Sequence, residues 1–141
     1  YYARSNRKNQ APFESRQLRS VSMSKKISLS KKIAVAEKCN WRCAYCGKDL
    51  DFETLRLDHV TPKAKGGGNG VKNLLPCCNN CNSKKGTLDL ESFRLRFSFQ
   101  NCVHGISFTT EQIRFLKENN VFELWGIDLG LFYFETIGVS V

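Results

Sequence analysis

The sequence has little negative charge and no long apolar stretch. No run of 18 apolar residues occurs among its 141, and this excludes a membrane-spanning helix. Only 13 acidic side chains stand against 22 lysines and arginines, which gives a net charge of +9. The hydrophobic share of 41% excludes a chain that is disordered throughout. A basic chain of 16.1 kDa is typical of one domain with a polyanionic partner, most simply nucleic acid.

The number of cysteines in the sequence is odd. Seven cysteines cannot all pair, so a framework built only of disulfides would leave one thiol over. The first residues lack the apolar core of a secretory signal peptide. We therefore expect a reduced, intracellular chain, cytoplasmic or nucleoid-associated, with thiols or a metal site. The single methionine, Met23, also allows a natural start at that residue or an organelle transit remnant before it.

Positive charge is concentrated near the N-terminus. Residues 1–38 carry ten basic and two acidic side chains, whereas residues 98–141 have a net charge of −3. Apolar residues show no helical or strand period in residues 1–29, where Ser, Arg, Lys, Asn and Gln dominate. We expect a flexible basic arm there, which either binds DNA without reading its sequence or is only a solvated tail.

Short helices and strands are predicted for the rest of the chain. Ser30 can cap a helix over residues 31–38, and alternation of apolar and polar residues predicts a strand at 55–60. A glycine-rich loop follows at 66–70. The remaining predicted elements are an extended piece at 73–75, helices at 78–85 and 89–97, a helix at 111–117 capped by Thr109 and Gln112, and a β-prone end at 130–135.

Two CxxC pairs, separated by 31 residues, are the strongest single motif. Each such turn directs two thiolates at one tetrahedral ion, and two turns complete a structural zinc site. The predicted zinc ligands are Cys43, Cys46, Cys78 and Cys81. One pair alone could be a redox dithiol, and Cys39 and Cys77 could also ligate, but the paired spacing is the tighter geometry. We expect the three cysteines left over (Cys39, Cys77 and Cys102) to be small buried apolar residues.

Potential catalytic groups lie between and just after the cysteine pairs. Asp58 and His59 end the predicted strand, Asn73 follows the glycine loop, and Asn82 comes directly after the last cysteine of the pairs. A lone histidine is usually structural, but this combination of neighbours is specific.

In order and spacing, residues 39–97 resemble the zinc-containing branch of the HNH nuclease family, the ββα-metal endonucleases. The matching segments are Cys43-Ala44-Tyr45-Cys46-Gly47, Leu57-Asp58-His59-Val60-Thr61-Pro62, Lys65-Gly66-Gly67, Asn73-Leu74-Leu75-Pro76 and Cys78 to Gly86. The resemblance implies an α+β fold with a small ββα-metal (His-Me finger) core, stapled by a four-cysteine zinc site and flanked by helices. We expect a basic arm at 1–29, the nuclease domain at 30–97, and a helix/strand extension at 98–141 that packs on it.

The resemblance also implies a metal-dependent DNA endonuclease that leaves 5′-phosphate and 3′-hydroxyl ends. His59 would be the general base, and Asp58 and Asn82 would hold one Mg²⁺ or Mn²⁺ ion. Asn73 would tie the loop down and orient the base. Many relatives have histidine where this chain has Asn82, and an amide oxygen favours harder ions.

Several lysines bracket the predicted site and are expected to contact the phosphate backbone; these are Lys63, Lys65, Lys84 and Lys85. A second interpretation is a non-catalytic, zinc-stabilised module that binds nucleic acid, because the cysteines and the charge fit both functions. A third is a nuclease detached from a mobile element. The Asp-His-Asn-Asn set favours the enzyme, since a pure binding module does not need it. The sequence indicates no membrane or small-molecule partner, and it does not determine the target or the oligomeric state.

Overall fold

The computed structural model describes residues 27–103 and 107–141, so most of the predicted arm lies outside the described residues. The helices are α1 (Leu29–Glu37), α2 (Asn79–Lys85), α3 (Leu90–Cys102), α4 (Thr110–Glu118), α5 (Val121–Leu124) and α6 (Tyr133–Thr136), with short 3-10 helices at Lys63–Lys65 (η1) and Val71–Asn73 (η2). The strands are β1 (Arg56–His59) and β2 (Leu74–Cys77). Within the described part, no helix has the length and apolar character needed to span a bilayer.

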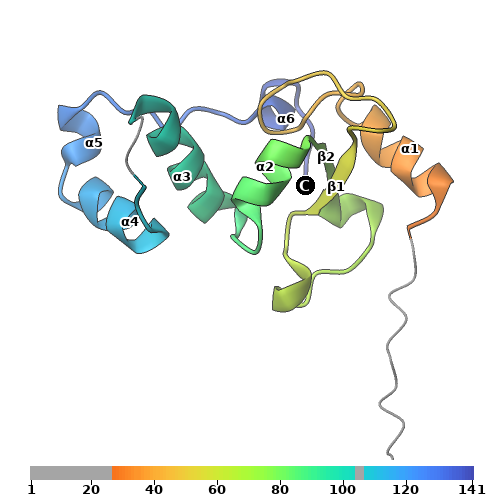
Figure 1. Cartoon of the computed structure of the whole chain (residues 1–141), viewed down its shortest axis with the longest axis horizontal. Helices are drawn as coiled ribbons and strands as arrows, with labels where there is room; N and C mark the ends of the chain where they lie inside the picture. Colours follow the sequence, from red (N-terminus) through yellow and green to blue (C-terminus); the bar gives the residue numbers. More distant parts are fainter. Residues whose placement is uncertain (1–26, 104–106) are drawn as a thin grey trace, which may run out of the picture.

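The two strands form one antiparallel sheet, and α2 follows directly from the second strand (Figure 1). Their register places Asp58 opposite Leu75 and His59 opposite Leu74. Strand β2 is buried along its whole length, and α2 contacts β1. Cys78 forms the N-cap of α2, and Gly86 ends it. This β1-β2-α2 unit confirms the predicted α+β class.

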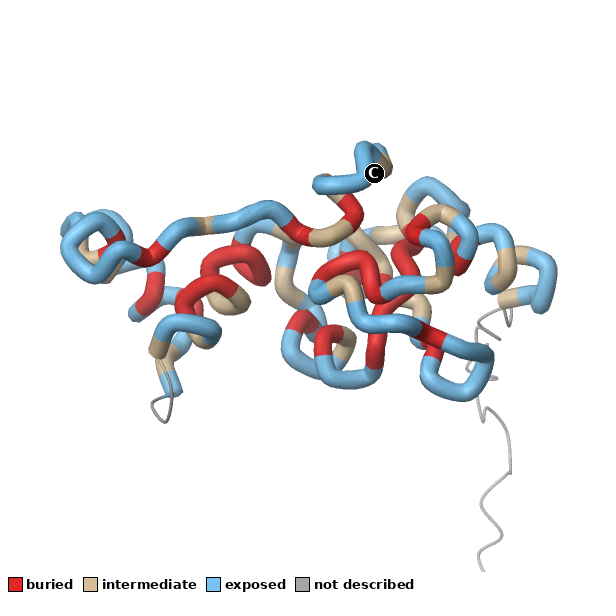
Figure 2. The backbone as a smooth tube through the Cα atoms, turned by 90° about the horizontal axis from the view of Figure 1, so that it is seen from above, coloured by how far each residue is buried: buried red, intermediate tan, exposed pale blue. Residues whose placement is uncertain are grey.

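Two hydrophobic clusters divide the described chain. The first lies around the sheet, the cysteines and Tyr45, and it includes aromatic rings from α3 and from the C-terminal segment. The second cluster lies among α3, α4 and α5 and consists of Leu95, Phe99, Ile113, Phe122 and Ile127. Figure 1 shows these three helices to one side of the sheet, and the chain then runs back to α6 beside it. Figure 2 shows buried stretches both in the part of the chain around the sheet and in the part formed by α3, α4 and α5.

Two secondary-structure predictions are wrong, one for the start of the first helix and one for the C-terminal segment. Helix α1 begins earlier than expected, because the Ser28 side chain, not that of Ser30, accepts the N–H of Lys31. The segment predicted to be β-prone at 130–135 contains the short helix α6 and no strand. Its first turn is fixed by Glu135, whose carboxylate accepts the backbone N–H of Phe132 at 2.7 Å. The capping box at Thr109 and Gln112 is confirmed.

A nearly buried arginine ties α6 to α3. Both terminal nitrogens of Arg94 donate to the carboxylate of Glu135, at 2.6 and 2.7 Å. The guanidinium also donates to the carbonyl of Gly130 at 3.1 Å and lies 4.6 Å from the ring centroid of Phe132. Hydrogen bonds from Arg94 lower the pKa of Glu135. This bidentate pair explains why the C-terminal segment returns to the sheet instead of adding a strand.

Candidate active site and metal centre

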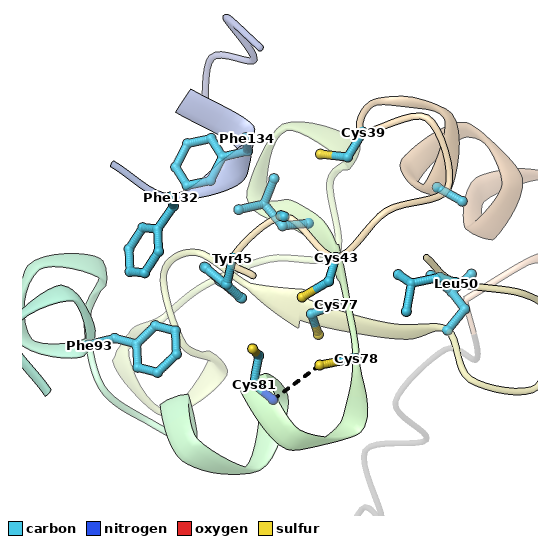
Figure 3. Packing of buried hydrophobic residues seen from close by; sticks show 14 residues of the cluster. Cys39, Cys43, Tyr45, Leu50, Cys77, Cys78, Cys81, Phe93, Phe132 and Phe134 are labelled. Atoms are coloured by element: carbon cyan, nitrogen blue, oxygen red, sulfur yellow. Dashed lines mark hydrogen bonds between the residues drawn. The ribbon is translucent and has the colours of Figure 1, made fainter. Parts of the chain in front are cut away.

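The four paired cysteines converge beside the sheet. The sulfur atoms of Cys43, Cys46, Cys78 and Cys81 all lie within 4.8 Å of one another. The sulfurs of Cys46 and Cys78 are 3.9 Å apart. A tetrahedral zinc ion with Zn–S bonds of about 2.3 Å would hold its sulfurs about 3.8 Å from one another. The thiol cluster is therefore compatible with a structural zinc ion, and Figure 3 shows three of its members side by side.

Local hydrogen bonds shape both cysteine turns. The N–H of Cys43 donates to the carbonyl of Lys48 at 2.7 Å, and the N–H of Cys81 donates to the sulfur of Cys78. The N–H of Ala44 donates to the carbonyl of Pro76 at 2.8 Å, which joins the first turn to β2. Side-chain hydrogen bonding with Cys81 lowers the pKa of Cys43 to about 5. A thiolate is the form that zinc binds.

The other three cysteines differ from one another in exposure. Cys39 and Cys77 are buried outside the thiol cluster, as predicted. Burial raises the pKa of Cys39 to about 11, so its thiol stays protonated. Cys102 is exposed, and the prediction that it is buried is wrong. The last fully buried residue of α3 is Phe99, and Cys102 lies in the helix end beyond it.

Asp58 is a buried carboxylate with two donors on one oxygen. Its Oδ2 accepts the hydroxyl of Tyr45 at 2.5 Å and lies 2.9 Å from the ammonium of Lys85. The described residues form no hydrogen bond to Oδ1, although every fully buried side-chain oxygen among them has a partner. Oδ1 is therefore not fully buried, although Asp58 as a whole is only 5% exposed.

Lys85 was predicted from the sequence to contact phosphates, but it does not lie on the surface. Its side chain is 0% exposed, because α2 packs this face on β1. Besides pairing with Asp58, its ammonium donates to the carbonyl of His59 at 2.7 Å. Lys63 and Lys84 are exposed as expected, and the exposed Lys65 pairs with Asp89 at 3.3 Å.

His59 is held by a residue of the glycine loop that the sequence analysis did not single out. Its Nε2 lies 2.9 Å from the side-chain oxygen of Asn69. An amide oxygen only accepts hydrogen bonds, so Nε2 is the donor, and in the neutral imidazole the lone pair lies on Nδ1. In the sequence, Asn69 is a single asparagine among glycines. Such a composition indicates a loop but does not indicate a contact with His59.

Asn73 ties down the loop, and its contacts are all with the backbone. Its side-chain oxygen accepts the N–H of Thr61 at 2.8 Å, and its amide nitrogen donates to the carbonyls of Thr61 and Gly68 at 3.1 and 2.9 Å. Any effect of Asn73 on the imidazole is therefore indirect, through the loop that carries Asn69.

Four of the predicted site residues, Asp58, His59, Lys63 and Asn82, line one open cavity of about 400 Å³. Asp58 and His59 come from the end of β1, and Asn82 comes from α2. Pro62 also lines the cavity, next to Lys63. A carboxylate and an amide oxygen are donors that suit Mg²⁺ or Mn²⁺, so the residues present fit a divalent ion. The cavity thus combines oxygen ligands with a histidine that has a free ring nitrogen.

Comparisons with known proteins relate the chain to endonucleases. Residues 43–98 match the family model described as HNH endonuclease. A stretch of 51 residues is 39% identical to the CRISPR-associated endonuclease Cas9 of Corynebacterium diphtheriae. This stretch covers 36% of the chain and 5% of that protein. The chain is 42% identical over 57 residues to the Septu protein PtuB of Bacillus thuringiensis, covering 38% of this chain and 22% of that protein.

Among solved structures, the Type II-C Cas9 enzyme from Actinomyces naeslundii aligns with a TM-score of 0.42 and 21% sequence identity. The alignment covers 67% of this chain and 12% of that one. The chain therefore spans only a small part of the length of the proteins that it matches.

The thiol cluster generates the first prediction. Cys43→Ser removes one ligand, so we expect loss of zinc and of the folded core, because zinc binding supplies folding free energy, about 10 kcal/mol in small zinc domains. Cys102→Ser, at an exposed position outside the cluster, is the control and should keep both zinc and thermal stability. Elemental analysis and thermal unfolding measure the two effects. A folded, zinc-free parent protein would contradict the assignment.

The second prediction concerns the glycine loop. A Cβ at Gly67 would lie 1.7 Å from the carbonyl oxygen of Thr61 and 2.9 Å from the amide nitrogen of Asn73. Gly67→Ala should therefore force the loop away from Thr61 and lower the unfolding free energy by about 1–3 kcal/mol. Gly68→Ala is the matched control, since its Cβ would meet no atom within 4 Å. Chemical denaturation of both variants measures the difference, and equal stabilities would refute this account of the loop.

Proposed function

Residues 43–98 belong to the HNH endonuclease family, and from this premise we propose that the chain is a metal-dependent endonuclease that hydrolyses DNA phosphodiester bonds. The products would carry 5′-phosphate and 3′-hydroxyl ends. The observation that carries the proposal is the cavity where Asp58, His59 and Asn82 meet while the imidazole keeps one nitrogen free.

His59 acts as the general base in this proposal. Its Nδ1 accepts a proton from the water that attacks phosphorus, and an imidazole suits this role because its ordinary pKa is close to neutrality. Asn69 holds the ring by Nε2 and thereby keeps the lone pair on Nδ1. Asn73 supports this arrangement by fixing the backbone of the loop.

Asp58 and Asn82 would hold one Mg²⁺ or Mn²⁺ ion. Such an ion, when bound, stabilises the charge that develops on the phosphate and on the leaving 3′ oxygen. The ammonium of Lys85 lies against the carboxylate of Asp58, and the hydroxyl of Tyr45 donates to it. The same two contacts leave Oδ1 as the carboxylate oxygen free for a cation. Zinc in the thiol cluster would serve only to hold the fold.

The charge distribution supports DNA as the substrate. Lys63 lines the cavity, and Lys65 and Lys84 are exposed near it, so three ammonium groups can meet the phosphates on either side of the scissile bond. The net charge of +9 adds attraction that does not depend on DNA sequence. Free thiols and a thiol cluster suit a reducing, intracellular compartment.

The central experiment compares the parent chain with His59→Ala on supercoiled plasmid in Mg²⁺, in Mn²⁺ and in EDTA. The parent should cut in either ion and stop in EDTA. His59→Ala should lose about 10²–10⁴ in rate, because it lacks the general base, while it keeps zinc and its circular dichroism spectrum. Sequencing of the ends tests the 5′-phosphate and 3′-hydroxyl assignment. A parent chain that binds DNA but never cuts it would favour the non-catalytic module instead.

Two asparagines of α2 provide a matched test of the ion site. Asn82 lines the catalytic cavity, whereas Asn80, two residues earlier, lines a different pocket near the cysteines. Asn82→Ala should raise the Mg²⁺ concentration for half-maximal cleavage by about 10-fold or more, with the rate partly recovered at high Mg²⁺. Asn80→Ala should leave the Mg²⁺ titration unchanged. Identical titrations for the two variants would remove Asn82 from the site.

A further inference from the structure

We infer that Tyr45 is a positioning residue for Asp58, and that through it the cysteine cluster and helix α6 set the orientation of the carboxylate that would hold the divalent ion. This inference rests on the proposed function. It assigns a role to a residue that touches neither DNA nor the ion.

Tyr45 links the thiol cluster to the candidate active site. It stands between Cys43 and Cys46 in the first cysteine turn, and it is 2% exposed. Its hydroxyl crosses to the sheet and donates to Oδ2 of Asp58 at 2.5 Å. A displacement of the cysteine turn would therefore move a hydrogen bond at the catalytic carboxylate.

The ring of Tyr45 is fixed by aromatic side chains from outside the ββα unit. The rings of Phe93 and Phe132 meet it edge-on, each with centroids 5.0 Å away, and Phe134 lies at 6.5 Å (Figure 3). The backbone is held as well, because the N–H of Phe134 donates to the carbonyl of Ala44 at 2.8 Å. The start of α3 and the region of α6 thus determine where the hydroxyl lies.

Two donors on one oxygen restrict the carboxylate more than one donor can. Lys85 alone would leave Asp58 free to pivot about a single contact, whereas Tyr45 and Lys85 together fix Oδ2. Asp58 lines the same cavity as Asn82, and Oδ1 is its carboxylate oxygen that neither donor holds. Loss of such a partner behind a metal ligand typically costs 10–100-fold in metal affinity or activity.

The test measures Mn²⁺ binding directly, by electron paramagnetic resonance of free Mn²⁺ with the full, zinc-loaded chain. Manganese prefers oxygen donors and should leave the thiol cluster alone. Tyr45→Phe keeps the ring but removes the hydroxyl, so the Mn²⁺ dissociation constant should rise about tenfold at unchanged zinc content. Cleavage should fall at low Mn²⁺ and recover near saturation, which a purely structural defect would not do. Tyr133→Phe, in the adjacent helix α6, is the matched control and should bind as the parent does.

Asp58→Asn separates this inference from the function on which it rests. If Asp58→Asn weakens Mn²⁺ binding but Tyr45→Phe binds as tightly as the parent or more tightly, the positioning role is refuted and the proposed function stands. If Asp58→Asn binds Mn²⁺ like the parent, Asp58 is not a ligand and both ideas fail. Phe132→Leu tests the packing of Tyr45, because it removes an aromatic contact to the Tyr45 ring while the Tyr45 hydroxyl is kept. It should weaken Mn²⁺ binding in the same direction, and unchanged binding would count against the role of α6.

Discussion

A buried carboxylate requires a buried cation beside it, and much of the site depends on this one pair. Asp58 and Lys85 are both almost fully buried, and removing either partner from such a pair would leave an unpaired charge at a cost of about 3–5 kcal/mol. The pair forms only if α2 lies against β1 with Lys85 turned inward. That rotation of the short helix also places Cys81 among the thiols and Asn82 on the cavity wall. One electrostatic requirement therefore orients residues of both the thiol cluster and the cavity.

The hydrogen bonds around this pair come from different parts of the chain. Lys85 also donates to the carbonyl of His59, so the same ammonium holds the backbone on which the proposed base sits. The imidazole itself is oriented from the opposite side, by the loop that carries Asn69 and that Asn73 secures. The carboxylate of Asp58 and the imidazole of His59 are neighbours in sequence but are fixed by separate sets of contacts.

Features with short sequence spacing were predicted well. The CxxC turns, the strand that ends in Asp58-His59 and the helix that begins after Cys78 each follow from local patterns, and the structure brings the four thiols together. The roles of His59, Asp58 and Asn82 stay predictions, although these residues share a cavity. Features that depend on tertiary packing were missed. Lys84 and Lys85 look equivalent in the sequence, and only the rotation of α2 on β1 decides which one is buried. A strand pattern near the C-terminus likewise gave way to a helix, because Arg94 could pair with Glu135.

The stacking of Phe93 on Phe132 has a consequence for the architecture of the chain. These rings lie 5.5 Å apart, so the point where the polypeptide leaves the sheet region and the point where it comes back are neighbours. Everything between them, including α4 and α5, is tethered at a single location and has its own apolar cluster. A lobe whose two connections to the rest of the chain lie side by side has the geometry at which insertions are tolerated. Its length and surface can change, or be exchanged for another unit, while the geometry beside the sheet stays the same.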